Sequence, residues 1–546
     1  MNNQKKKSKA TSFLIQGSIL AVAGILVRII GMVYRIPLTN TIGEKGMGVY
    51  STAFSIYNIL LMISSYSLPL AVSRLVAARL SVGQYRNARR VFLGAIGFAT
   101  ISGIAGCAIT FFGADFFAGT LMGMPEAAFA IKTLAPTILI MAFLGVFRGY
   151  FQGHGTMIPT AISQVAEQVI NAVISVLAGW LLFRMGTAKD VGGSEFFGPS
   201  YGAAGGTIGT GAGALTALLF CILVFLLFRR VERMQCRRDR NREQETYSHV
   251  AKVLVLTIVP VLVSTTVYQI STLVDQAIYA AYLDADYTAV WGVYSSKYNL
   301  LVHVPVAIAS SLASSIIPAL SGAVAKKNRT EVVYKTGTAI RFNMVIAFPA
   351  TVGLTVLATP IMNLLFSGDN QVAAQMMMVG STAVLFYSLS TITNSILQGI
   401  GSIWIPVKNA LISLALHLIL LAVLLWGFKL DIYGVVYANI FFALCMCILN
   451  NLSIKRILHY RQEMLKTFAA PLFSSVVMGV FTYLSYRLVY QLAGHNWLAV
   501  LAAVVVAVAV YVVLLLLTKG LDEVDLMSMP KGRTMIAVFK KLHLLR

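Results

Sequence analysis

Long runs of apolar residues, almost free of charged side chains, divide the whole sequence and constrain its fold more than any other feature. A helix needs roughly 20 apolar residues to cross the hydrocarbon core of a bilayer, and an uncharged run of about 18 residues already indicates a spanning helix. Of the 546 residues, 58% are apolar and only 12% are charged. The sequence therefore predicts an all-α polytopic membrane protein.

We count fourteen apolar runs, and the charges between them predict a topology. The predicted spans are 11–36, 47–72, 91–114, 128–150, 157–183, 202–228, 252–282, 290–320, 338–363, 372–398, 405–427, 432–453, 467–489 and 496–518. Basic residues gather in alternate loops, at 74–90, 229–242, 326–335 and 455–466. Because cytoplasmic loops carry the excess of Lys and Arg, both termini are predicted to be cytoplasmic. The four lysines of residues 2–10 precede a span too long for a cleaved signal peptide, so we expect an uncleaved signal anchor.

Two similar motifs indicate that the chain is built from repeated halves. YFQGHGTMIP (150–159) follows the fourth span, and ILQGIGSIWIP (396–406) follows the tenth. Repeated halves are usual in secondary transporters, which bind their substrates between them. The glycines of these motifs are predicted to form turns or, alternatively, hinges between moving lobes. They are Gly153, Gly155, Gly399 and Gly401.

The segment 229–242 (RRVERMQCRRDRNR) is too charged to be buried and is predicted to link the two halves. The predicted parts are an N-lobe (1–228), a cytoplasmic linker (229–251), a C-lobe (252–454), spans thirteen and fourteen (455–520) and a cytoplasmic amphipathic tail (521–546). The last two spans form either a lipid-facing groove or a scaffold. The basic loops and the tail predict contact with anionic lipids of the inner leaflet.

Two arginines, Arg28 and Arg35, lie inside the first predicted span. A guanidinium at membrane depth costs roughly 2.5–3.5 kcal/mol on insertion scales, so it normally faces a protein interior or a watery cavity. A spacing of seven residues is almost two helical turns, so both side chains leave nearly the same face of one helix. They predict an anion-binding site, although Arg35 alternatively reaches the outer interface.

Glu167 lies inside the fifth predicted span, where it borders a polar stripe. The stripe consists of Gln164, Gln168 and Asn171, which recur at helical spacing. A polar face within a span indicates a wet or protein-lined interior. Glu167 is predicted to pair with an arginine, to bind a coupling cation or to form an interhelical hydrogen bond.

Lys297 and Asp275 are further charged candidates. Lys297 has no carboxylate within a helical turn and is a second candidate ligand for an anion. Asp275, toward the outer end of the seventh span, is a candidate ion ligand unless it is simply solvated. No cofactor or metal is predicted, because nucleotide-binding motifs are absent from the sequence and its five cysteines lie in apolar spans or a basic loop. A driving force is expected from Na⁺, H⁺, the membrane potential or consumption of the product.

The chain resembles the polysaccharide-flippase branch of the MOP exporter superfamily, which includes lipid II flippases (MurJ) and their sporulation relatives (SpoVB). The resemblance is carried by ILVRIIGMVYRIPLTNTIGEKGMGVYSTAFSIYNIL, by FRGYFQGHGTMIP and by the repeated halves. It implies a MATE-like fold and a cationic cavity for the pyrophosphate of lipid II, lined by two first-helix arginines that Arg28 and Arg35 match. Lys297 loosely matches a basic residue of the family's eighth span. The family's sodium site draws on carboxylates of spans seven and eleven; Asp275 could supply the first, whereas span eleven offers only Asn409 and His417, so the resemblance does not imply sodium coupling. The basic residue of the family's second span has no counterpart in 58–65.

The arginines and the resemblance together predict a flippase, not an enzyme. It would move an undecaprenyl-pyrophosphate-linked sugar, lipid II first of all, from the inner to the outer leaflet of a bacterial plasma membrane by alternating access. The alternatives are a flippase for another undecaprenyl-linked oligosaccharide and a MATE-like drug or cation antiporter, which should have acidic cavity residues. A glycosyltransferase or a scaffold for the cell-wall machinery fits less well. The predicted partners are the lipid-linked sugar, anionic lipids and the cell-wall synthesis machinery, but not nucleic acid, because the net charge of +23 follows the loop topology.

Overall fold

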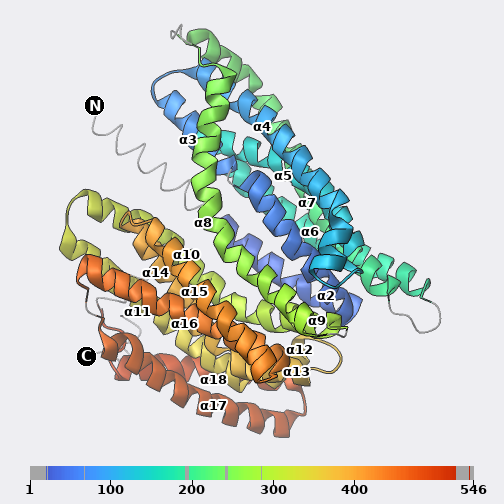
Figure 1. Ribbon diagram of the computed structural model, residues 1–546. Coiled ribbons are helices and arrows are strands. Elements are labelled where there is room, and N and C mark those ends of the chain that lie inside the picture. The colour runs from blue at the N-terminus through green and yellow to red at the C-terminus, as the bar shows by residue number, and fades with distance from the viewer. Residues whose placement is uncertain are drawn as a thin grey trace. The chain divides into compact units, whose positions relative to one another are not determined.

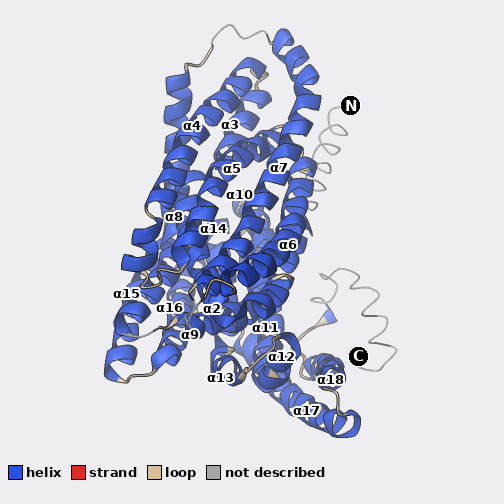
Figure 2. Ribbon diagram, turned by 90° about the vertical axis from the view of Figure 1, so that its right-hand side faces the viewer, coloured by secondary structure: helices blue, strands red, loops and turns tan. Residues whose placement is uncertain are grey.

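The computed structural model describes residues 20, 22–66, 68–190, 196–239, 244–283, 286–460, 462–523, 536 and 540. Within these residues the secondary structure is helical, with no strand (Figures 1 and 2). Ten helices of the described part are long and apolar enough to cross a membrane. The number is up to eleven if the bent pair α13 (Gln371–Gly380) and α14 (Thr382–Gly399) forms one span. The predicted all-α polytopic membrane fold is therefore confirmed.

The chain divides into two compact units, Met1–Ser296 and Lys297–Arg546. Unit 1 contains α2 (Arg35–Leu61), η1 (Met62–Tyr66), α3 (Leu68–Ser81), α4 (Tyr85–Phe112), η2 (Phe116–Leu121), α5 (Ala127–Gly153), α6 (Ile158–Thr187), α7 (Phe197–Arg238), α8 (Tyr247–Tyr282) and α9 (Thr288–Val293). The π-helix η3 (Tyr294–Tyr298) contains the unit boundary. The lobe and linker boundaries stay a prediction, and most of the predicted tail (521–546) lies outside the described residues.

Unit 2 begins with α10 (Asn299–Ala325) and α11 (Arg329–Val356) and includes α13 and α14. Its other helices are α12 (Ala358–Leu365), α15 (Trp404–Ala422), η4 (Val423–Gly427), α16 (Asp431–Leu458), η5 (Leu465–Ala469), α17 (Ala470–Ala493) and α18 (Asn496–Leu517). One core cluster lies between α10, α11, α14 and α16, and a second joins α11 to α17 and α18. The hydroxyl of Tyr511 on α18 donates to the carbonyl of Val345 on α11 over 2.8 Å. An apolar cavity of about 350 Å³ is lined mainly by α11, α17 and α18, near Gly353 and Met478.

A row of small residues lets α6 and α7 pack backbone to backbone in unit 1. Glycines at 205, 209 and 213 recur every four residues of α7, so they lie on one face of that helix. A Cβ added to Gly205 would lie 2.3 Å from the carbonyl oxygen of Ala178, and one added to Gly213 would lie 2.4 Å from that of Glu167. No larger side chain fits at this distance, so the glycine row fixes how close α6 lies to α7.

Aromatic side chains fill the core of unit 1 between α4, α5 and α7. The ring of Phe92 on α4 lies 5.4 Å from that of Phe147, 4.6 Å from that of Tyr150 and 4.9 Å from that of Phe225, measured between centroids. Aliphatic residues of α3 and α8 complete this cluster. The cluster holds α5 in place, and α5 in turn positions a charged residue of the site described below.

The two repeated motifs form matching turns at the ends of α5 and α14. The amide of Gly155 donates to the carbonyl of Gln152 over 2.9 Å, and that of Gly401 donates to the carbonyl of Gln398 over 3.0 Å. Both glycines have positive φ, +79° and +87°, where a side chain would be strained. The other two glycines of the motifs, Gly153 and Gly399, instead end their helices against a neighbour, on α3 and on α10 respectively. Equivalent turns in the two units support an internal repeat.

Candidate functional site

The first helix of unit 1 carries Arg28 and Arg35 on one face. Residues 22–33 are helical, and helical hydrogen bonds continue through Tyr34 into α2, from Tyr34 N to Ile30 O and from Leu38 N to Tyr34 O. The two arginines therefore keep the shared face that their spacing predicts. Arg28 is exposed, whereas Arg35 is half-buried. The guanidinium of Arg35 lies 5.6 Å from the ring centre of Phe54, and no described group accepts a hydrogen bond from its buried Nε.

This arginine face lies against the polar stripe of α6. Gly31 shares the face with Arg28 and Arg35, because the three residues stand at i, i+3 and i+7. A Cβ built on Gly31 would lie 3.7 Å from the side-chain oxygen of Gln168, so the first helix contacts the stripe between its two arginines. On another side, the same two helices and Thr216 of α7 line an open apolar groove of about 640 Å³, whose walls include Leu26 and Val169.

Glu167, the charged residue next to the stripe, is paired with an arginine of α5. Nη2 of Arg148 lies 2.7 Å from Oε2 of Glu167, and the two side chains are 9% and 16% exposed. Nε of Arg148 donates to Oγ of Ser163 over 2.9 Å, and that hydroxyl donates to the carbonyl of Thr160 over 2.8 Å. Of the roles open to Glu167, the structure shows pairing with an arginine.

Arg148 is not among the residues predicted from the sequence, although the sequence contains a signal for it. It lies inside the predicted span 128–150, where any arginine is a functional candidate by the same rule that singled out Arg28. Its proximity to Glu167 is a tertiary contact that spacing along the chain does not reveal. Asn171 of the stripe instead joins α6 to α7, because its Oδ1 accepts from Thr210 of α7 over 3.4 Å. The same oxygen accepts from Ser175, within α6, over 2.8 Å.

Lys297 and Asp275 belong to elements other than α6, Lys297 to η3 and Asp275 to α8. Lys297 belongs to unit 2 and is 1% exposed. Its Nζ donates to Oδ1 of Asn370 over 2.7 Å and lies 5.8 Å from the ring centre of Phe366. Asp275 on α8 is 2% exposed, so it is buried rather than solvated. In the described part of the chain, no group of three or more His, Cys, Asp or Glu side chains could hold a metal ion.

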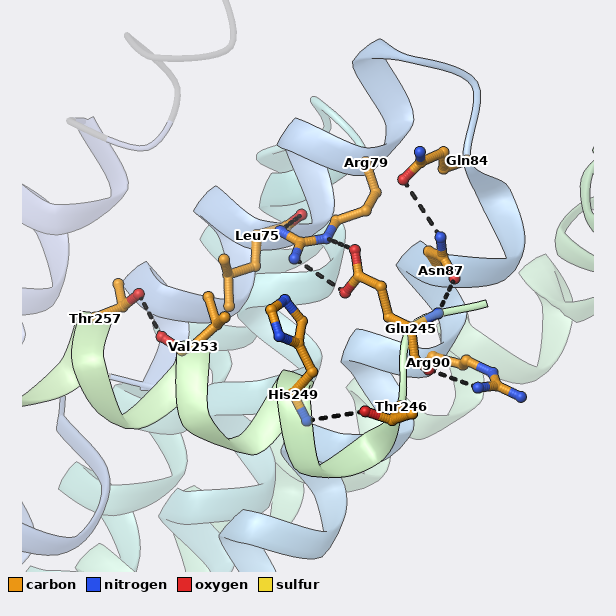
Figure 3. A network of polar contacts seen from close by, with 10 residues as sticks. All are labelled: Leu75, Arg79, Gln84, Asn87, Arg90, Glu245, Thr246, His249, Val253 and Thr257. Carbon is orange, nitrogen blue, oxygen red and sulfur yellow. Dashed lines mark hydrogen bonds and ion pairs between the residues drawn. The ribbon is translucent and has the colours of Figure 1, made fainter. Parts of the chain in front are cut away.

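A polar network joins the α3–α4 turn of unit 1 to the segment before α8 (Figure 3). Arg79 makes two hydrogen bonds to the carboxylate of Glu245, of 3.2 and 3.1 Å, and the amide of Glu245 donates to Asn87 over 3.1 Å. Arg90 contacts the backbone carbonyl of Glu245. Arginines of a loop predicted to be cytoplasmic thus also hold the chain that leads into α8.

Asp286 lies outside the spanning segments, between α8 and α9. Partial burial raises the pKa of its carboxyl, but hydrogen bonds from Thr288 and the ammonium of Lys45 outweigh that effect. The backbone amide of Thr288 donates over 2.9 Å, and Nζ of Lys45 lies 3.3 Å from Asp286. The pKa of Asp286 is therefore lowered, and the carboxylate fastens α2 to the start of α9.

Comparison with known proteins shows which family the chain resembles. A family model described as "Polysaccharide biosynthesis protein" matches residues 14–324, more than half of the chain. Stage V sporulation protein B of Bacillus subtilis is 24% identical over 95% of this chain and 98% of its own length. The lipid II flippase MurJ of the same organism is 23% identical over 86% of this chain and 88% of its own length.

The fold has a solved counterpart as well. The structure described as "Lipid II flippase MurJ, inward closed conformation" has a TM-score of 0.66 and 15% identity, and the match covers 91% of this chain and 97% of that one. The expected MurJ- and MATE-like fold is thereby confirmed. Since these proteins are flippases and transporters, the expectation that the chain is not an enzyme is confirmed too. The chain belongs to the polysaccharide biosynthesis protein family.

Proposed function

We propose that this protein moves a sugar carried on a polyprenyl diphosphate, with lipid II as the first candidate, from the inner to the outer leaflet by alternating access. The observation that carries the proposal is the placement of the first helix. The face with Arg28 and Arg35 lies against the polar stripe of α6 at Gly31 and Gln168. Two guanidinium groups beside a polar wall suit an anionic group that has lost its water.

The chemistry of arginine supports a diphosphate as the bound group. A guanidinium stays charged at membrane depth and donates in a planar fork that matches phosphate oxygens. The polyprenyl tail stays in lipid, so only the charged group and the sugar need a polar path. The name of the lipid II flippase that this chain resembles supports a cell-wall precursor as cargo.

The charge balance of unit 1 argues against a cation antiporter. Such a transporter needs an acidic site for its substrate, and the charged residue beside the stripe is Glu167. Its carboxylate is already neutralised by Arg148 at 2.7 Å. Because the charges of Arg148 and Glu167 offset each other, the net charge of the site comes from Arg28 and Arg35 and is positive, which favours an anionic cargo. Another undecaprenyl-linked oligosaccharide remains the alternative cargo, because the arginines bind the diphosphate and not the sugar.

The proposal includes fourteen spans, with both termini in the cytoplasm of a bacterium. The helical stretch Val22–Ser81 has 60 residues, about 90 Å at 1.5 Å per residue, which is enough for two spans. If that stretch counts as two spans, the ten long apolar helices give eleven spans. Adding α8, α10 and the bent pair α13–α14 brings the number to fourteen. The alternation of basic loops supports the orientation. We further propose that Lys297 anchors the start of α10 through Asn370, and that Asp275 is the residue to test for ion coupling.

The experiment measures lipid II in the outer leaflet of cells depleted of their own flippase. The cells receive this protein, its Arg28→Ala variant or, as a matched control, Arg184→Ala, which removes an exposed arginine at the far end of α6 that stacks on Trp180. We expect the intact protein and Arg184→Ala to restore exposed lipid II and Arg28→Ala to fail at equal expression. Failure of all three would contradict lipid II as cargo, and full rescue by Arg28→Ala would refute the arginine site.

A further inference from the structure

The pair formed by Arg148 and Glu167 is placed unusually for a structural ion pair. Both side chains are mostly buried, at 9% and 16% exposure, within helices α5 and α6 that are long and apolar enough to span the membrane. Glu167 is next in sequence to Gln168, which lies against Gly31 of the arginine-bearing first helix. The carboxylate of the pair is therefore next in sequence to the residue of α6 that contacts the arginine-bearing first helix.

Hydrogen bonds orient the guanidinium of Arg148 toward Ser163 and Glu167 of α6. Ser163 donates its own hydroxyl proton to Thr160, so its oxygen is left to accept the hydrogen bond from Nε of Arg148. That contact fixes the plane of the guanidinium, while Nη2 reaches Glu167. Among the described residues, no group accepts a hydrogen bond from Nη1 of Arg148 or donates one to Oε1 of Glu167.

We propose that Arg148 is a third guanidinium for the diphosphate of the cargo and that Glu167 is an internal counter-ion, holding Arg148 while the site is empty and releasing it on loading. The inference deepens the proposed function and rests on it. An arginine buried without a partner would be strongly destabilising, so an empty site needs a carboxylate in this place. A diphosphate offers the same kind of oxygen acceptor with more charge, so it accepts the hydrogen bonds that the guanidinium of Arg148 donates to Glu167 in the empty site.

The competing explanation is a permanent brace between α5 and α6. A brace and an exchangeable counter-ion respond differently to two variants. Glu167→Gln keeps the shape of the side chain but removes the charge that competes with the cargo for Arg148. Reversing the pair in Arg148→Glu/Glu167→Arg preserves the ion pair but places the arginine on α6 instead of α5.

The experiment measures binding of farnesyl diphosphate, with farnesyl monophosphate for comparison, to the purified full-length protein in nanodiscs. We expect Arg148→Ala to weaken diphosphate binding by on the order of tenfold to a hundredfold, as for a lost hydrogen bond to a charged group. Arg148→Lys should restore part of the affinity, because lysine keeps the charge without the fork. Glu167→Gln should bind the diphosphate more tightly than the intact protein does, and the reversed pair should unfold at the normal temperature yet bind weakly.

Two results would overturn the inference: weaker binding in Glu167→Gln, to the same extent as in Arg148→Ala, or full recovery of binding in the reversed pair. Thermal unfolding of every variant separates loss of binding from loss of fold. Arg28→Ala separates the inference from the proposed function. If Arg28→Ala loses affinity while Arg148→Ala keeps it, only the role of Arg148 is refuted, whereas unchanged binding in Arg28→Ala contradicts the arginine site itself.

Discussion

Replacing Gly213 by alanine tests whether the close packing of α6 on α7 sets the geometry of the polar stripe. Gly213 lies on α7 opposite Glu167, although it contacts the backbone of that residue rather than its carboxylate. An added Cβ would lie 2.4 Å from the carbonyl oxygen of Glu167 and 3.1 Å from Cβ of Asn171. The nearest atom is backbone, so no side-chain rotation relieves the overlap.

The size of the effect follows from these distances. Ordinary contact begins near 3.4 Å, so α6 must move away from α7 by about 1 Å at Glu167. A shift of that size directed away from α5 lengthens the 2.7 Å contact between Arg148 and Glu167 beyond hydrogen-bond range. Overpacking of this kind costs about 1–3 kcal/mol. We therefore expect Gly213→Ala to lower both the stability and the transport of the cargo.

The assay compares thermal unfolding and lipid flipping of Gly213→Ala with those of Gly97→Ala. Gly97 lies in the middle of α4, where an added Cβ meets no atom within 4 Å. Alanine there should be neutral or stabilise by up to about 1 kcal/mol, through its better helix propensity. If Gly213→Ala matches the intact protein in both measurements, glycine packing does not determine the position of Glu167, and the reasoning is refuted.

Three further predictions test other parts of the structure. A double-mutant cycle between Arg79 and Glu245 should give a coupling energy of about 1–2 kcal/mol in thermal unfolding, between the values of exposed and buried pairs, and a value near zero would contradict the network before α8. Gly155→Ala and Gly401→Ala should each cost about 1 kcal/mol of stability because both positions have positive φ, and equal stability to the intact protein would speak against these turns. Because the pKa of Asp286 is lowered in the folded protein, its contribution is present at neutral pH and is lost as the pH falls below about 4. Asp286→Asn should therefore lower the unfolding temperature at pH 7, with a difference that shrinks in acid, and a difference independent of pH would refute the role of the carboxylate.

Features that depend on one stretch of chain could be predicted from the sequence. The apolar runs indicated a polytopic helical protein because bilayer thickness sets the length of a span. The spacing of Arg28 and Arg35 predicted a shared face because helical geometry is local, and the continuous hydrogen bonds through Tyr34 preserve it. Likewise, Gly155 and Gly401 revealed matching turns because positive φ selects glycine at each position.

Features that depend on contacts between distant segments could not be predicted from the sequence. Nothing near Glu167 in the sequence identifies Arg148 as its partner, because that contact is made by the packing of α5 against α6. Lys297 was a candidate anion ligand because the sequence has no carboxylate within a helical turn of it, but the sequence does not show that Asn370, far along the chain, accepts a hydrogen bond from it. Arg79 was interpreted as part of a basic cytoplasmic loop that contacts lipid headgroups. The sequence does not show that Glu245 lies beside it.

The central claim, that the arginine face of the first helix binds the diphosphate of a lipid-linked sugar, is tested most directly in proteoliposomes. The measurement is the rate at which the purified protein exposes three fluorescent undecaprenyl lipids that carry the same sugar on a diphosphate, a monophosphate or a neutral linker. We predict rapid movement of the diphosphate lipid, slower movement of the monophosphate and little movement of the neutral lipid, with the preference for the diphosphate lost in Arg28→Ala. Equal rates for all three lipids, or an unchanged preference in Arg28→Ala, would contradict the claim.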